Sequence, residues 1–168
     1  MPDVMRLKHR KLLGNLGNAL EALFGENLGS MREDPQGKTL SAEIAEVRQR
    51  ITAEAEACFL AAGLDAMPAD EHNAKRPDLG QGPALTRDLT KPVGALNKPG
   101  NSTVQSIMRG LDAETDHLNG EIVLLGRLFG VATPVNLAVQ QAMASVAVQQ
   151  GGVGQVRPAE LLHAAASL

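Results

Sequence analysis

With 168 residues, of which 43% are hydrophobic and 21% charged, the chain is long enough for one domain with a substantial apolar core. The net charge of −3 argues against nucleic acid as the main partner, because phosphate binding favours a basic field. With no apolar run of the ~18 residues that a membrane span needs, no secretory signal and a single cysteine, we expect a cytoplasmic protein.

The first predicted element is a helix over residues 4–24. Its leucines and Val4 recur at close to the helical period of 3.6 residues. Gly14 and Gly17 lie inside this segment, where each glycine costs about 1 kcal/mol relative to alanine. The two glycines suggest that another backbone or a ligand approaches the helix closely.

A polar loop is expected over residues 25–40, followed by the most regular helix, over 41–62. Gly63 is placed to end that helix. Cys58 lies on its apolar stripe, which favours a core position over a nucleophilic role. Residues 64–100 carry five prolines and predict an irregular stretch with a short helix near 84–90.

The C-terminal part predicts four further helices, at 102–109, 114–129, 133–149 and 157–166. The third of them is expected to begin with Thr133 as N-cap and Pro134 as first helical residue, a common way to start a helix. The remaining signals are glycines that end or interrupt helices, namely Gly110, Gly130, Gly151, Gly152 and Gly154. No period-two alternation persists, so the expected fold class is all-α.

Simple chemical motifs are absent from the sequence. It contains no G-x-G-x-x-G, no Walker motif, no C-x-x-C and no H-E-x-x-H, and its four histidines are dispersed, so no metal site and no cofactor-binding residues are identified. The acidic cluster Asp70-Glu71-His72 is interpreted as a solvated loop. Asn119 and Asn136 are expected to bond backbone groups at turns or helix starts.

Two segments resemble the C-terminal domain of ketopantoate reductases (2-dehydropantoate 2-reductases). In the first, Lys11 is followed after four residues by Asn15, and Asn18 is followed by Ala and Leu. The second resembles the family's serine-led helix followed by T-E-I-D-Y-I-N-G and G-V-x-T-P-x-N; here it reads STVQSI from Ser102, ETDHLNG from Glu114, and GVATPVN from Gly130. The resemblance covers about residues 5–147.

The resemblance implies a role for each matching residue. Lys11 would be the catalytic lysine that protonates the ketone oxygen of a 2-oxo acid while NADPH provides hydride. Asn15, Asn18, Ser102 and Glu114 would bind the substrate, with positioning of Lys11 as the alternative role of Glu114. The family also implies pantothenate biosynthesis and the helical fold of the 6-phosphogluconate dehydrogenase C-terminal superfamily.

Some positions depart from the family pattern. Asn18 lies seven residues after Lys11 where the family has eight, which makes Lys8 a competing candidate for the catalytic lysine. The family's tryptophan near the lysine is missing. Ser106, Ala113 and His117 replace family residues, which leaves ketopantoate and a different 2-oxo acid as alternative substrates.

We expect residues 1–168 to form a single helical domain, with a flexible break and a short terminal helix over 151–168. No βαβ unit precedes the first helix, so the family's nucleotide-binding (Rossmann) domain is expected to be absent from this chain. Three explanations are open: a shortened gene or fragment, a split enzyme with a separate nucleotide-binding partner, or a domain repurposed for dimerisation or partner binding. The chain alone is expected to be inactive.

Overall fold

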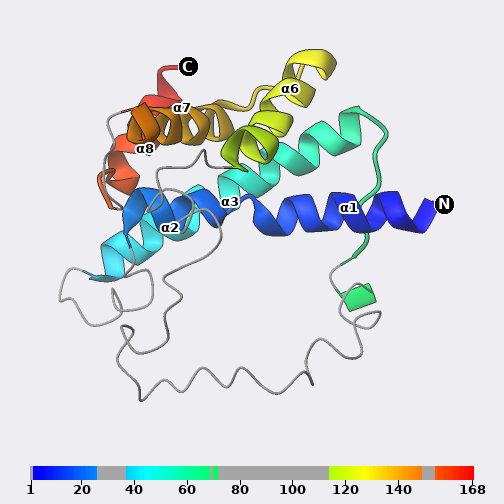
Figure 1. Cartoon of the computed structure of the whole chain (residues 1–168), viewed down its shortest axis with the longest axis horizontal. Helices are drawn as coiled ribbons and strands as arrows, with labels where there is room; N and C mark the ends of the chain where they lie inside the picture. Colours follow the sequence, from blue (N-terminus) through cyan, green and yellow to red (C-terminus); the bar gives the residue numbers. More distant parts are fainter. Residues whose placement is uncertain (1, 26–36, 69, 72–113, 149–153) are drawn as a thin grey trace.

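The computed structural model describes residues 2–25, 37–68, 70–71, 114–148 and 154–168, and the regular elements of these ranges are all helices (Figure 1). In chain order they are α1 (Pro2–Asn15), α2 (Asn18–Phe24), α3 (Gly37–Ala61), the 3₁₀-helix η4 (Glu114–His117), α6 (Asn119–Phe129), α7 (Pro134–Val148) and α8 (Pro158–Ala166). The expected all-α class is confirmed. Over the same ranges, no helix combines the length and apolar character that crossing a membrane would require.

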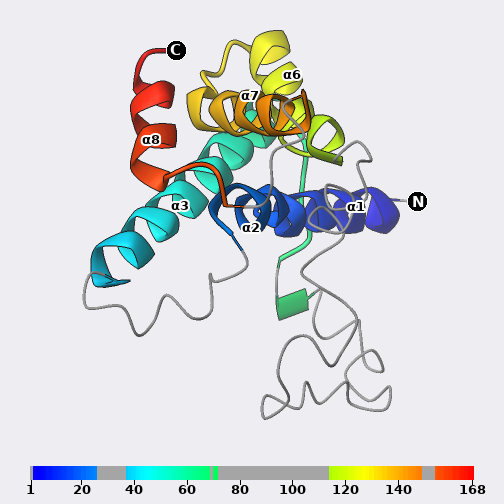
Figure 2. The same cartoon turned by 60° about the vertical axis from the view of Figure 1, so that its left-hand side comes forward.

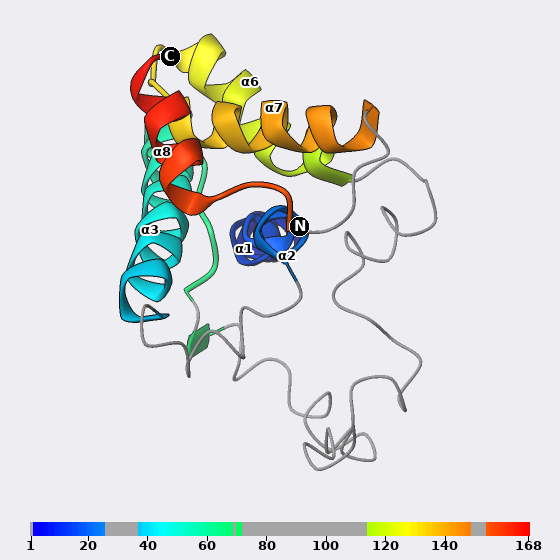
Figure 3. The ribbon, with the colours of Figure 1, turned by 90° about the vertical axis from the view of Figure 1, so that its left-hand side faces the viewer.

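The first two helices lie almost end to end, and α3 runs obliquely beside them (Figure 1, Figure 2). Helix α7 packs against α2, α3, α6 and α8, which makes it the central element of the described part. Figure 3 looks along α1 and shows α2 in line with it, α3 to one side and α7 across the top. The α1–α2 pair therefore lies in a corner formed by α3 and α7.

The core lies where α2, α3, α6 and α7 meet. Its members are apolar side chains that recur at helical spacing, including Leu20, Leu23, Val47, Ile51, Ile122 and Val139. Burying each such side chain contributes roughly 1.5–3 kcal/mol. Helices as short as α2 are marginal in isolation, so it is this packing that holds them.

The helix expected over 4–24 is in fact two helices with a junction at Leu16–Gly17. The turn is closed by a hydrogen bond from the Leu20 amide to the Gly17 carbonyl (3.1 Å). The idea that another backbone approaches the glycines is wrong for the described residues. A Cβ at Gly14 would meet nothing within 4 Å, and one at Gly17 would meet only the Arg48 side chain, at 3.9 Å.

Two other helix starts differ from expectation. α3 begins at Gly37 rather than at 41, inside the expected loop. The helix expected over 114–129 is divided into η4 and α6, since Leu118 has non-helical angles (φ −116°, ψ −84°). The ends are as expected: Gly63 and Gly130 follow their helices with φ of 64° and 71°, the left-handed region that favours glycine.

Several expected features lie outside the described residues. They are the helices at 84–90 and 102–109, Gly110, Gly151, Gly152 and His72. The last helix is confirmed as α8, with Pro158 at its first position. Gly154 has a φ of 84°.

The acidic cluster expected to be solvated is partly engaged. The guanidinium of Arg6 contacts the carboxylate of Glu71 at 3.3 Å and that of Asp65 at 2.6 Å, and the Asp65 hydrogen bond is the main cause that raises the pKa of Arg6. The Met67 amide also donates to the Arg6 carbonyl (3.0 Å). These contacts tie the first turns of α1 to the segment that follows α3.

Cys58 is buried in the core, as its position on the apolar stripe predicted. Its thiol lies 3.7 Å from the Ile122 carbonyl oxygen. Burial raises the pKa of Cys58 above its usual value of 9.0, and the negative charge of Glu54 raises it further. The folded chain therefore keeps the thiol proton at a pH where the unfolded chain loses it.

This pKa shift predicts a pH-dependent contribution to stability. Above the unfolded pKa, unfolding releases a proton, so stability falls by up to about 1.4 kcal/mol per pH unit until the folded pKa is reached. Wild type should therefore exceed Cys58→Ala in free energy of unfolding by less near pH 10 than near pH 7. Urea unfolding of both proteins at the two pH values measures it, and a constant difference would contradict the shift.

Candidate functional site

The candidate site is built around the α1–α2 junction. Asn15 is the last residue of α1 and Asn18 the first of α2, so the two asparagines flank Leu16–Gly17. Both are half-buried, whereas Lys11, one turn before Asn15, is exposed. Residues four apart share a helix face, so Lys11 and Asn15 project on the same side of α1.

The two candidate lysines lie at different positions along α1. Both Lys8 and Lys11 are exposed on α1. With a rise of 1.5 Å per residue, the backbone of Lys11 lies about 6 Å along the helix from Asn15 and that of Lys8 about 10 Å. Lys11 and Asn18 are seven residues apart, but α1 ends between them. Helical geometry therefore does not determine the angle between their side chains. Lys11 therefore lies closer to Asn15 along α1 than Lys8 does.

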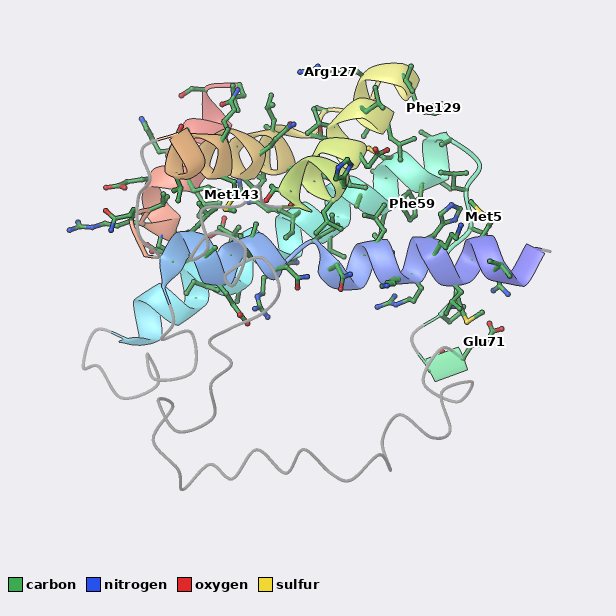
Figure 4. The ribbon with its side chains drawn as sticks, viewed as in Figure 1. Met5, Phe59, Glu71, Arg127, Phe129 and Met143 are labelled. Atoms are coloured by element: carbon green, nitrogen blue, oxygen red, sulfur yellow. The ribbon has the colours of Figure 1, made fainter. Side chains whose placement is uncertain are left out.

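Helix α1 is attached to other elements at two points. At its middle, the His9 ring packs against Phe59 of α3 with centroids 5.2 Å apart, and His9 Nδ1 lies 2.6 Å from the Asp65 carbonyl oxygen. Figure 4 shows Phe59 directed from α3 toward α1. At its end, the Leu16 carbonyl accepts a hydrogen bond from Asn119 Nδ2 (3.4 Å). Lys11 thus lies on a helix held at two points.

Asn119 belongs to a buried polar network. Its Nδ2 also donates to Asn136 Oδ1 (3.0 Å), and Asn136 Nδ2 donates to the Ile51 carbonyl (3.1 Å) and to Glu54 Oε2 (2.7 Å). Both asparagine side chains are completely buried. The expectation that they bond backbone groups is confirmed for Leu16 and Ile51, and the link between the two side chains was not foreseen.

Glu54 caps the start of α7. Its carboxylate accepts from the backbone N–H of Val135 and of Asn136, both at 2.9 Å. Thr133 was expected to be the N-cap. It directly precedes the helix, and its carbonyl accepts a hydrogen bond from the Leu137 amide (3.0 Å). The free amides of Val135 and Asn136, however, are bonded by the Glu54 carboxylate. Glu54 was not among the residues predicted from the sequence. The available signal was a glutamate directly beside buried Ala55 on the apolar stripe of α3.

The remaining candidates are only partly placed. Ser102 lies outside the described residues. Glu114 is the first residue of η4, which packs against α6 and α7 and leads directly to Asn119; its side chain is outside the description. Thr115 in the same turn is buried, and its Oγ has no hydrogen-bond partner among the described residues. The described groups of three or more His, Cys, Asp or Glu include none that could hold a metal ion.

Comparisons with known proteins bear on the family and the fold of the chain. A family model described as the ketopantoate reductase PanE/ApbA C-terminal domain matches residues 3–147. A crystal structure of a PanE/ApbA family ketopantoate reductase from Ralstonia eutropha JMP134 is similar, with a TM-score of 0.55 and 24% identity. That match covers 84% of this chain and 41% of the relative, so the chain spans less than half of its length. A comparison with curated protein sequences gives no match.

Proposed function

Because the chain belongs to the family of ketopantoate reductase C-terminal domains, we propose that it supplies the substrate-binding residues and the catalytic lysine of a 2-oxo acid reductase. The observation that carries the proposal is the α1–α2 junction. It lies beside the helix face that presents Lys11 and Asn15, and Asn119 and Asn136, which support it, belong to the family-like motifs.

The chemistry proposed for Lys11 is that of a general acid. An ammonium group beside a ketone oxygen stabilises the negative charge that develops there and donates the proton that completes the alcohol. Asn15 and Asn18 carry amide groups that can donate to a carboxylate or hydroxyl of the substrate. Ser102 and Glu114 are proposed to bind the substrate hydroxyl groups. Ketopantoate is the first substrate to test, and other 2-oxo acids are the alternatives.

The reductant implied by the family is NADPH, and the described residues do not fit its binding on their own. A dinucleotide is typically held by a glycine-rich turn between a strand and a helix, and the described ranges contain only helices and their connections. We therefore assign the cofactor to a separate nucleotide-binding domain that would meet this chain at the substrate. The cytoplasm, where NADPH and 2-oxo acids are present, is the proposed location.

The test uses the chain joined to the nucleotide-binding domain of a ketopantoate reductase. We expect this fused protein to oxidise NADPH when ketopantoate is added, and the chain alone to show no turnover. The fused protein must first be shown to be folded and to bind NADPH. Absence of turnover with ketopantoate and with a panel of other 2-oxo acids would then contradict the proposed function.

A second candidate function is a non-catalytic module that dimerises or binds a partner. It is favoured by apolar side chains on the outer face of α6, where Leu124 is 49% exposed, Leu128 67% and Phe129 47%. Figure 4 shows Phe129 at the outer end of this helix. Exposed apolar patches often mark interaction sites. Sedimentation that shows a monomer at all concentrations would count against a homodimer.

A further inference from the structure

A continuous line of hydrogen bonds runs from α3 to the α1–α2 junction through Glu54, Asn136, Asn119 and the Leu16 carbonyl. We infer that Glu54 is a positioning residue for the proposed substrate site, acting through this line to hold the junction between Asn15 and Asn18. The inference rests on the proposed function for its role in binding, but the structural link that it requires can be tested separately.

The carboxylate of Glu54 determines which groups donate and which accept along this line of hydrogen bonds. Its two carboxylate oxygens accept three hydrogen bonds: from the Val135 amide, from the Asn136 amide and from Asn136 Nδ2. A carboxylate only accepts, so it favours the orientation of Asn136 in which the NH₂ group faces Glu54. The opposite orientation would place Asn136 Oδ1 against the carboxylate and the Ile51 carbonyl.

The orientation of Asn136 in turn determines that of Asn119. With Asn136 Oδ1 directed at Asn119, only the NH₂ group of Asn119 makes favourable contacts, one hydrogen to Asn136 Oδ1 and the other to the Leu16 carbonyl. Reversing Asn119 would place its oxygen against two other oxygens. The carboxylate of Glu54 on α3 therefore determines that Asn119 presents its NH₂ group, and not its oxygen, to the Leu16 carbonyl.

The last link is the most easily lost. The bond from Asn119 Nδ2 to the Leu16 carbonyl is 3.4 Å long, beyond the usual range for N–H···O bonds. Leu16 follows the last residue of α1, and the turn after it is closed by the Gly17 carbonyl rather than the Leu16 carbonyl. When Asn119 is no longer oriented, we expect the junction to shift first, and with it the spacing of Asn15 and Asn18.

The experiment compares three variants of the chain by ¹H–¹⁵N NMR. Glu54→Gln removes the charge at similar size, and Asn119→Ala removes the hydrogen bonds to Leu16 and to Asn136 while leaving Glu54 in place. Glu56→Gln is the matched control, because Glu56 lies two residues along α3 and is exposed. We expect the Gly17 amide, whose peptide bond carries the Leu16 carbonyl, to change its chemical shift in the first two variants and not in the control. A variant that is only less stable, but still folded under the conditions of the measurement, would not change the Gly17 resonance in particular.

Titration with ketopantoate then tests the consequence for binding. Residues that act through a packed network change affinity only moderately, so we expect Glu54→Gln and Asn119→Ala to weaken ketopantoate binding by about tenfold and Glu56→Gln to leave it unchanged. If wild type binds no 2-oxo acid, the proposed function fails, while the Gly17 comparison still decides whether Glu54 positions the junction. If Glu54→Gln does not fold, Asn119→Ala decides whether the last link of the line holds the junction, without which Glu54 cannot act on it. A Gly17 shift that matches the control in every folded variant overturns the inference.

Discussion

Replacement of Lys11 by alanine should lower the turnover of the fused reductase with ketopantoate by about 100- to 10,000-fold, the usual contribution of a general acid. The variant loses both the proton donor and the positive charge next to the ketone oxygen. Lys11 is exposed on α1, so its truncation leaves no cavity in the core. The measurement is the initial rate of NADPH oxidation at saturating ketopantoate.

Lys8→Ala is the matched control for this experiment. Lys8 is also an exposed lysine of α1, but it lies about 4 Å farther along the helix from Asn15. We expect the Lys8 variant to keep most of the wild-type rate. If Lys8→Ala loses activity and Lys11→Ala keeps it, the assignment of the lysine is wrong; if both variants retain full activity, the chain does not supply the general acid.

Replacement of Gly126 by alanine should destabilise the fold by about 1–3 kcal/mol or more, the typical cost of overpacking a core. Gly126 is buried on α6, and its carbonyl accepts the Val131 amide (2.8 Å). A Cβ at this position would lie 2.5 Å from the Val131 carbonyl oxygen and 2.7 Å from Thr133 Cγ2. Backbone oxygen cannot move aside cheaply, so the turn between α6 and α7 must shift. Urea unfolding measures the loss.

Gly14→Ala is the opposite case and serves as the control. Gly14 is also helical, but a Cβ there meets no described atom within 4 Å. Alanine should therefore stabilise the chain by roughly 0.5–1 kcal/mol through its better helix propensity. The prediction fails if Gly126→Ala is as stable as wild type, or if the two substitutions change the free energy of unfolding in the same direction.

The helical elements could be predicted from the sequence because their signals are local. Ile44, Val47 and Ile51 recur at helical spacing, and Gly63 and Gly130 end helices where the backbone needs a positive φ. The break at Leu16–Gly17 was not predicted. The apolar spacing continues across it from Leu16 to Leu20 and Leu23, so periodicity alone indicates one helix.

The candidate site was accessible from the sequence only in part. Lys11 and Asn15 could be paired because residues four apart share a helix face. Glu54 could not be connected with the start of α7. It lies 81 positions before Val135 and 82 before Asn136 in the sequence, and the contact depends on how α3 and α7 pack. Thr133 offered a local explanation for the start of α7, so nothing in the sequence indicated a contact from α3.

The most direct test of the account is a residue-resolved NMR titration of the chain with ketopantoate. The account predicts saturable chemical-shift changes that are largest at Lys11, Asn15 and Asn18, with little change at Lys8. Such a result would place the 2-oxo acid at the α1–α2 junction. Saturable binding that leaves these three residues unperturbed and affects another surface, or no binding of ketopantoate or any other 2-oxo acid, would contradict it.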